Sequence, residues 1–113
     1  MIIMKELLTI EEWNEVLEKS KDEPVLLLKH STTCPISTSA FSRVEEFETD
    51  MPKYWLKVRE SRPISNEIES NLGVVHQSPQ LFILNEGEAV WNASHTVITP
   101  NEIKRGLAEN SLS

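Results

Sequence analysis

Apolar residues recur at three- and four-residue steps in four stretches of the chain, and each stretch predicts a helix with one apolar face. In the first stretch, Thr9 stands three residues before Glu12, which is the spacing of a capping box, and the helix should end near Ser20. The second helix should begin at Pro35 and stop before Pro52, whose ring would disrupt a helix interior. The other two helices are predicted at residues 61–72 and 100–110.

Four further stretches lack this spacing and are predicted to be strands. The first, residues 25–30, is a nearly continuous apolar run, as expected for a central strand that is covered on both faces and parallel to a neighbour. The second covers residues 54–59. The last two, residues 80–84 and 88–92, flank a short connection that contains Gly87, so they should pair antiparallel.

The predicted elements follow the order helix, strand, helix, strand, helix, strand, strand, helix. Few architectures combine parallel crossovers in one half with a hairpin in the other. This is the order of the thioredoxin fold, so the prediction is an α/β fold with a central mixed four-stranded sheet flanked by helices. The 113 residues suit one domain, and we expect residues 1–113 to form a single thioredoxin-like domain.

The charge distribution removes several classes of partner. The formal net charge is -7, and lysines and arginines are scattered among the acids, so the basic patch of a nucleic-acid binder is missing. No window reaches the apolar length of a membrane span, and residues 1–10 have no positively charged segment ahead of an apolar one. We therefore expect no nucleic-acid or membrane partner and a cytoplasmic location.

The sequence contains one cysteine, Cys34, at the predicted junction between the strand at 25–30 and the next helix. A single cysteine cannot form an internal disulfide or supply several thiolates to zinc. A thiol at a helix start lies near unpaired backbone N–H groups, which favour the reactive thiolate. An inert buried cysteine is the alternative, but Thr32 and Thr33 are not a core sequence. We interpret Cys34 as a redox-active thiol.

Two nearby elements could act on this thiol. Ser37 stands where a Cys-x-x-Cys oxidoreductase would carry its second cysteine. Its hydroxyl could donate a hydrogen bond to the thiolate, or it could be an ordinary polar group in the first helical turn. The Ser78–Pro79 bond, just before the strand at 80–84, can be cis and would then fix a tight turn beside the thiol, with an ordinary trans bond as the alternative.

The three histidines lie on different segments of the chain. His30, His76 and His95 offer no recognisable spacing of zinc ligands, so no metal site is expected. His30 and His76 could tune the thiolate if they folded close to it. A solvated loop position is the simpler expectation for both.

With these residues in view, the chain resembles a known family, the monothiol bacilliredoxins, also called YtxJ-like general stress proteins. The matching segments are Lys-His-Ser at 29–31, Thr-Cys-Pro-Ile-Ser at 33–37, His-Gln-Ser-Pro-Gln at 76–80 and Val-Trp-Asn at 90–92. The likeness spans nearly the whole chain, and the second and third segments at this separation make it specific.

The resemblance implies a thioredoxin fold and the removal of bacillithiol from proteins that carry it as a mixed disulfide. Cys34 would be the nucleophile that takes bacillithiol onto itself. Pro79 would be the cis-proline, and Ser78 would offer backbone hydrogen bonds to the cysteinyl part of the bound thiol. Bacillithiol is implied as a co-substrate without any tightly bound cofactor, and bacillithiolated proteins are implied as partners. The expected contact residues are Thr33, Pro35, Ser37, Ser78 and Pro79.

Bacillithiol contains a malate, whose carboxylates should seek cations or helix N-termini. Lys29, the lysine nearest to Cys34 in sequence, and Arg43 on the following helix are candidates, with a solvated surface charge as the alternative for both. Two other functions stay open at this point. One is the reduction of peroxide or arsenate by Cys34, and the other is a stress adaptor of thioredoxin fold that binds partners without turnover.

Overall fold

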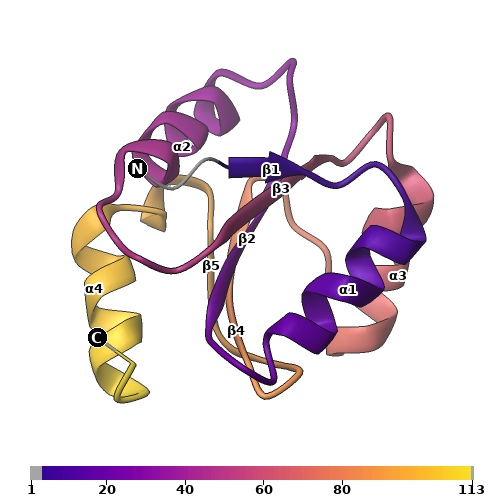
Figure 1. The fold of residues 1–113 in the computed structure, drawn as a ribbon. Helices are drawn as coiled ribbons and strands as arrows, with labels where there is room; N and C mark the ends of the chain where they lie inside the picture. Colours follow the sequence, from indigo (N-terminus) through magenta and orange to yellow (C-terminus); the bar gives the residue numbers. More distant parts are fainter. Residues whose placement is uncertain (1–3, 113) are drawn as a thin grey trace.

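The middle strand of the sheet, β2 (Val25–His30), is buried along its whole length. It pairs in parallel with β3 (Lys53–Lys57) and antiparallel with β4 (Gln80–Asn85). The unbroken apolar run predicts this position, because both faces of the strand are covered by helices. The computed structural model in Figure 1 describes residues 4–112 of the chain.

The sheet has five strands, which corrects the prediction of four. The additional strand is β1 (Met4–Glu6), which pairs in parallel with β3, and the order across the sheet is β1-β3-β2-β4-β5. Three residues are too short to display the alternation that identifies a strand in a sequence. The open side of β3 supplies the hydrogen-bonding partners, so β1 is a product of tertiary structure rather than of local propensity.

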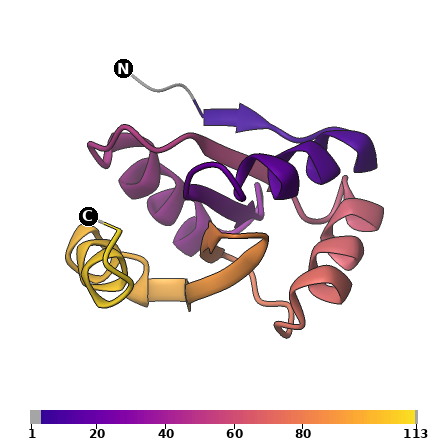
Figure 2. The same ribbon diagram turned by 60° about the horizontal axis from the view of Figure 1, so that its bottom comes forward.

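Helices cover both faces of the sheet. Figures 1 and 2 show α1 and α3 on one side and α2 and α4 on the other. The thioredoxin-like α/β architecture expected from the sequence is therefore present, and the four helices occupy the predicted stretches. Their bounds are α1 Ile10–Lys19, α2 Pro35–Glu46, α3 Arg62–Leu72 and α4 Pro100–Glu109.

The helix ends follow the local signals in the sequence. The Thr9 hydroxyl accepts the N–H of Glu12, and the Glu12 carboxylate accepts the N–H of Thr9, which completes the capping box of α1. At the other end of the sequence, Thr99 accepts the N–H of Glu102 and starts α4. Gly73 ends α3 with a φ of 67°, a left-handed conformation that glycine adopts without steric cost.

The hairpin between β4 and β5 (Glu88–Ser94) is antiparallel, as predicted. Its turn residues Glu86 and Gly87 both have positive φ values, which suits the right-handed twist of the strands. Ser20, at the end of α1, holds the turn in place because its carbonyl accepts the N–H of Glu86 and its hydroxyl accepts the N–H of Gly87. A short 3₁₀ helix, η1 (His95–Val97), follows β5.

Two hydrophobic cores lie on opposite faces of the sheet. Leu26 and Leu28 belong to the core under α2 and α4, and Val25 and Leu27 belong to the core under α1 and α3. Side chains alternate between the two faces of a strand, so neighbouring residues of β2 serve different cores. Burial of each leucine contributes about 2 kcal/mol to stability, and β2 is thereby fixed as the rigid support of the connection that follows it.

A close contact joins α4 to β5. Gly106 in α4 faces the ring of Trp91, and a Cβ atom at position 106 would lie 2.7 Å from ring carbons. Only glycine allows this approach, so the position of α4 on the sheet depends on that residue. Across residues 4–112, no helix is long and apolar enough to cross a membrane.

Candidate active site

Cys34 is the N-cap residue of α2, directly after the connection that leaves β2. It is partly exposed. Its backbone N–H donates to the carbonyl of Ser31 (3.3 Å), and its own carbonyl accepts the N–H of Thr38 (3.0 Å), so both sides of the residue are held by the main chain. Pro35 is the first residue of the helix, a position that suits the fixed φ of proline. The thiol is thus presented at the N-terminal end of a helix, where backbone N–H groups point outward.

The hydroxyl of Ser37 is directed at the strand behind the thiol. Ser37 is fully buried, its Oγ lies 2.8 Å from Nδ1 of His30, and it accepts the N–H of Ser31 at 2.8 Å. These contacts hold the first turn of α2 to the end of β2. In this arrangement the hydrogen bonds of Ser37 go to His30 and Ser31, whereas the sequence left open a bond to the thiolate of Cys34.

His30 is buried beneath the thiol connection, and the expectation that it is a solvated loop residue is wrong. Only 8% of its surface is exposed, and its ring packs 4.9 Å from the ring of Phe41 and 5.7 Å, edge to face, from that of Trp55. Burial lowers the pKa of His30, and Lys57 lowers it further, while the contact with Ser37 and the charge of Glu60 raise it. The imidazole is therefore a neutral support at pH 7.

The Ser78–Pro79 peptide bond is cis and lies at the same end of the sheet as the thiol connection. The ladder between β2 and β4 pairs Lys29 with Gln80, so the residues after Lys29 and those before Gln80 leave the sheet side by side. Figure 1 shows both connections at the upper end of the sheet. The Pro79 carbonyl accepts the N–H of His95, and Oγ of Ser78 is a buried atom with no hydrogen-bond partner among residues 4–112.

The structure therefore places the expected contact residues in two neighbouring segments. Thr33 and Pro35 are exposed on either side of Cys34, while Ser37 lies one turn further along α2 and faces inward. The second segment is the turn at Ser78 and Pro79. Such a surface can present a nucleophilic sulfur beside a backbone edge that is able to bind an extended group.

Comparison with known proteins agrees with this geometry. A family model described as monothiol bacilliredoxin BrxC matches residues 5–103. The chain belongs to the monothiol bacilliredoxin family. A solved protein of thioredoxin fold, described as a candidate oxidoreductase, is 36% identical with a TM-score of 0.85, over 92% of this chain and 93% of that one. Family and fold give the chain a thiol redox function of the thioredoxin-like oxidoreductase kind.

Thioredoxins share the fold at lower identity. The thioredoxin of Malassezia sympodialis has a TM-score of 0.77 at 14% identity, over 98% of this chain and 93% of that one. The thioredoxin of Trypanosoma brucei brucei has a TM-score of 0.76 at 12% identity, over 97% and 92% of the two chains. These likenesses place the bacilliredoxin-family chain within the thioredoxin fold.

The two cations considered for the malate group are not solvated surface charges in this member of the bacilliredoxin family. Lys29 has no exposed surface, and its ammonium group lies 3.1 Å from Nδ1 of His76. Arg43 is half-buried, and its Nε donates to the carbonyl of Ile98 at 2.6 Å. Because Lys29 is covered on all sides, its charge is out of reach of a ligand in this conformation.

Sequence reasoning missed a polar cluster on the α3 side of the sheet. His76 contacts Lys29 and also Ser65 and Glu69 of α3, while Gln80 of β4 bonds the residues on either side of His76. One signal pointed to it, since Lys29 is a charged residue inside an otherwise apolar central strand and such a residue requires polar neighbours. His76 lies in a loop, as expected, but it is half-buried against these groups instead of fully solvated.

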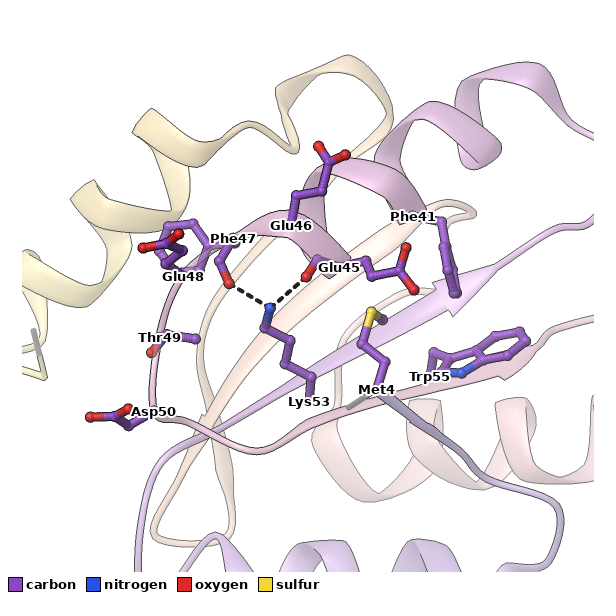
Figure 3. Close-up of a pocket in the computed structure, with 10 residues that line it drawn as sticks. All are labelled: Met4, Phe41, Glu45, Glu46, Phe47, Glu48, Thr49, Asp50, Lys53 and Trp55. Carbon is purple, nitrogen blue, oxygen red and sulfur yellow. Dashed lines mark hydrogen bonds between the residues drawn. The ribbon is translucent and has the colours of Figure 1, made fainter. Parts of the chain in front are cut away.

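A surface pocket lies at the far end of α2, roughly 18 Å along the helix axis from the thiol. Figure 3 shows Lys53 inside it, donating to the carbonyls of Glu45 and Phe47. This lysine satisfies the C-terminal carbonyls of the helix. Phe41 and Trp55 line the pocket and also contact His30. Within residues 4–112, no group of three or more His, Cys, Asp or Glu side chains could hold a metal ion.

Proposed function

We propose that the chain removes bacillithiol from S-bacillithiolated proteins in the cytoplasm by monothiol exchange at Cys34. One observation carries the proposal: in a chain of the monothiol bacilliredoxin family, the single cysteine occupies the N-cap position of α2, at the same end of the sheet as the Ser78–Pro79 turn. With one thiol the chain can exchange through one mixed disulfide and must then be reset from outside.

In the proposed reaction the Cys34 thiolate attacks the bacillithiol sulfur of the client's mixed disulfide. A bond forms between Sγ and that sulfur while the client's S–S bond breaks, and the client leaves as a thiolate that takes a proton from water. An external low-molecular-weight thiol, such as a second bacillithiol, then attacks the mixed disulfide on Cys34. This step frees the Cys34 thiolate and yields a disulfide between the two small thiols, so the external thiol supplies the electrons.

The neighbouring residues have distinct proposed roles. The backbone at Ser78 and Pro79 would bind the cysteinyl part of bacillithiol. The buried Ser78 hydroxyl, which has no partner among residues 4–112, supports a polar contact at this turn. Thr33 and Pro35 would flank the bound thiol from the α2 side. Ser37 acts indirectly, because its bonds to His30 and Ser31 hold the thiol connection in position.

The decisive experiment follows the bacillithiol group by mass. A client protein carrying bacillithiol on one cysteine is mixed with the reduced protein, and both are weighed by intact mass spectrometry over time. We expect the client to lose one bacillithiol and the protein to gain it on Cys34, whereas a Cys34→Ser variant should leave the client unchanged. If the client keeps its bacillithiol in the presence of the wild-type protein, the proposal is wrong.

The same assay separates the alternative functions. Hydrogen peroxide and arsenate are offered to the reduced protein in place of the mixed disulfide, and the rates are compared. A faster reaction with either oxidant would favour the peroxide or arsenate reductase function. A Cys34→Ser variant that keeps its protective effect in cells would favour the adaptor, because binding without turnover does not require the sulfur.

A further inference from the structure

Lys29 is a buried cation in the middle strand, five residues before Cys34. None of the ion pairs within residues 4–112 includes it. Burial lowers the pKa of Lys29 to about 8, and the charge of Glu69 opposes this shift only in part. Removing a charge from water without a close counter-charge destabilises the folded state. An apolar side chain at this position would give a more stable fold.

The ammonium group makes a single hydrogen bond among the described residues. Its Nζ lies 3.1 Å from Nδ1 of His76 and 6.0 Å from the centre of the Phe82 ring. An ammonium group can only donate, so Nδ1 accepts and the ring proton of His76 lies on Nε2. Burial lowers the pKa of His76, as do the charges of Lys29 and Arg62, while Glu69 raises it, and a neutral His76 fits this bond.

His76 lies in the connection from α3 to β4, and that connection is fastened by buried or half-buried side chains. The N–H of His76 donates to the Glu69 carboxylate at 2.8 Å. The side chain of Gln80 accepts the N–H of Gln77 at 3.1 Å and donates to the carbonyl of Val75 at 3.2 Å. The next residues along the chain are Ser78 and Pro79, which leave the sheet at the same end as the connection to Cys34. The contact between Lys29 and His76 thus ties this connection to β2, the strand that leads to Cys34.

We propose that Lys29 is a positioning residue for thiol–disulfide exchange, whose hydrogen bond to His76 fixes residues 75–79 and thereby the Ser78–Pro79 surface on which the disulfide lies. The inference rests on the proposed function insofar as exchange occurs at Cys34 beside this turn. It explains why a lysine stands in a strand whose other buried positions are almost all apolar.

The first test compares Lys29→Met with the wild-type protein and with Lys104→Met, which removes an exposed lysine of α4. Methionine replaces the buried cation with an apolar chain of similar length, so the denaturation midpoint should stay equal or rise. We expect kcat/KM for exchange to fall by about tenfold or more, because a misplaced binding surface slows the reaction. Lys104→Met should keep the wild-type rate. A Lys29→Met rate within about twofold of the wild-type rate would overturn the proposal.

Two substrates keep this result independent of the identity of the small thiol. One client carries bacillithiol and a second carries cysteine on the same residue, so both present a cysteinyl group at the turn. If the wild-type protein reacts only with the cysteinylated client, bacillithiol removal is wrong while the role of Lys29 can still be scored. A wild-type protein that reacts with neither client overturns both proposals.

The second test detects the contact between Lys29 and His76 through the NMR signals of the His76 ring nitrogens. Nitrogen-15 NMR should show the proton on Nε2 in the wild-type protein, and the titration midpoint of His76 should move upward in Lys29→Met because a neighbouring positive charge is lost. An unchanged midpoint would contradict the contact. His76→Asn keeps an acceptor near the position of Nδ1 and should exchange faster than His76→Leu. Adding His76→Leu to Lys29→Met should slow exchange much less than His76→Leu does alone, since both changes break the bond between Lys29 and His76.

Discussion

Oγ of Ser37 lies 2.8 Å from Nδ1 of His30, so the hydroxyl one helical turn after the thiol is bonded to the strand that precedes the thiol. The same hydroxyl accepts the N–H of Ser31. Ser37 therefore holds the two ends of the connection that carries Cys34 together. It stands at the position where dithiol oxidoreductases have their second sulfur. A monothiol chain can use this position for support because no resolving thiol is needed there.

Replacing Ser37 with cysteine should convert the chain into a dithiol protein. Residues three apart at a helix start are neighbours, so the new thiol can attack the mixed disulfide on Cys34 and release the small thiol. Mass spectrometry should then show an internal disulfide without a retained adduct. Ser39→Cys, at an exposed position on the same helix, is the control and should keep the adduct. A persistent adduct in Ser37→Cys would refute this prediction.

The same substitution should lower stability. The new side chain replaces the hydroxyl that bonds His30 and Ser31, and poorly satisfied buried groups cost about 1–3 kcal/mol. Urea unfolding of Ser37→Cys and Ser37→Ala, both kept reduced, should show losses of this size. Two variants with wild-type midpoints would mean that these bonds contribute little.

His30 should make the fold sensitive to acid. Its pKa is lowered in the folded protein, mainly by burial, so the unfolded chain binds more protons once the pH falls through about 6.5, the ordinary value of histidine. The free energy of unfolding should therefore decrease from that pH down to the lower folded-state pKa. Denaturant titrations between pH 7.5 and pH 5 should give a shallower decrease for His30→Asn than for the wild-type protein.

The control for this slope is His95→Asn, because His95 is exposed and asparagine tolerates its positive φ of 56°. His76 has a lowered pKa too and contributes with the same sign, so the comparison concerns the difference between variants. Equal slopes for His30→Asn and the wild-type protein would show that His30 binds protons equally in both states.

Lys29 should have its effect at alkaline pH. Its pKa falls from 10.5 to about 8 on folding, so the unfolded chain binds more protons between these values and the wild-type protein gains stability as the pH rises through them. The full shift corresponds to about 3 kcal/mol, and relaxation and water penetration around the buried charge make about 1–3 kcal/mol the expected gain. The difference in unfolding free energy between wild type and Lys29→Met, measured at pH 7.5 and pH 10.5, gives this quantity directly. A difference that stays constant with pH would contradict it.

Gly106→Ala should destabilise the protein although alanine is the better helix former. The helix propensity of alanine contributes about 1 kcal/mol in its favour. A Cβ 2.7 Å from the ring of Trp91 forces the helix or the ring to move, and such overpacking costs about 1–3 kcal/mol. Thermal unfolding should show a lower midpoint for Gly106→Ala. In a Trp91→Leu background the same change should cost less or become favourable, and an equal cost in both backgrounds would rule out the ring as the cause.

The helices could be read from the sequence because their signals are local. Thr9 and Glu12 lie within one turn of each other, and Gly73 ends α3 through its own φ angle. The strand β1 could not be predicted in this way, since Met4–Glu6 form a strand only because β3 offers an open edge. Local chemistry thus determines most elements here, and tertiary pairing determines the shortest one.

The site residues show the same contrast between local signals and tertiary contacts. Cys34 and the Ser78–Pro79 turn were found because a lone cysteine at a strand-to-helix junction and a proline before a strand are visible in the sequence. The burial of His30 and Lys29 was not foreseen, since it depends on Phe41, Trp55 and Phe82 from other elements. A sequence shows which groups are present, but the solvent around each group depends on the whole fold.

The place of β2 in the sheet has a consequence for how the protein opens. Two strands separate it from the outside on each side, with β1 and β5 at the edges. Amide hydrogen exchange in such a sheet is fastest in fraying outer segments and slowest in the centre, where exchange requires global unfolding. The amides of β2, the strand that leads to Cys34, should therefore exchange among the slowest. Loosening of the outer strands by mild heat would therefore leave Cys34 presented on an intact support until the whole domain unfolds.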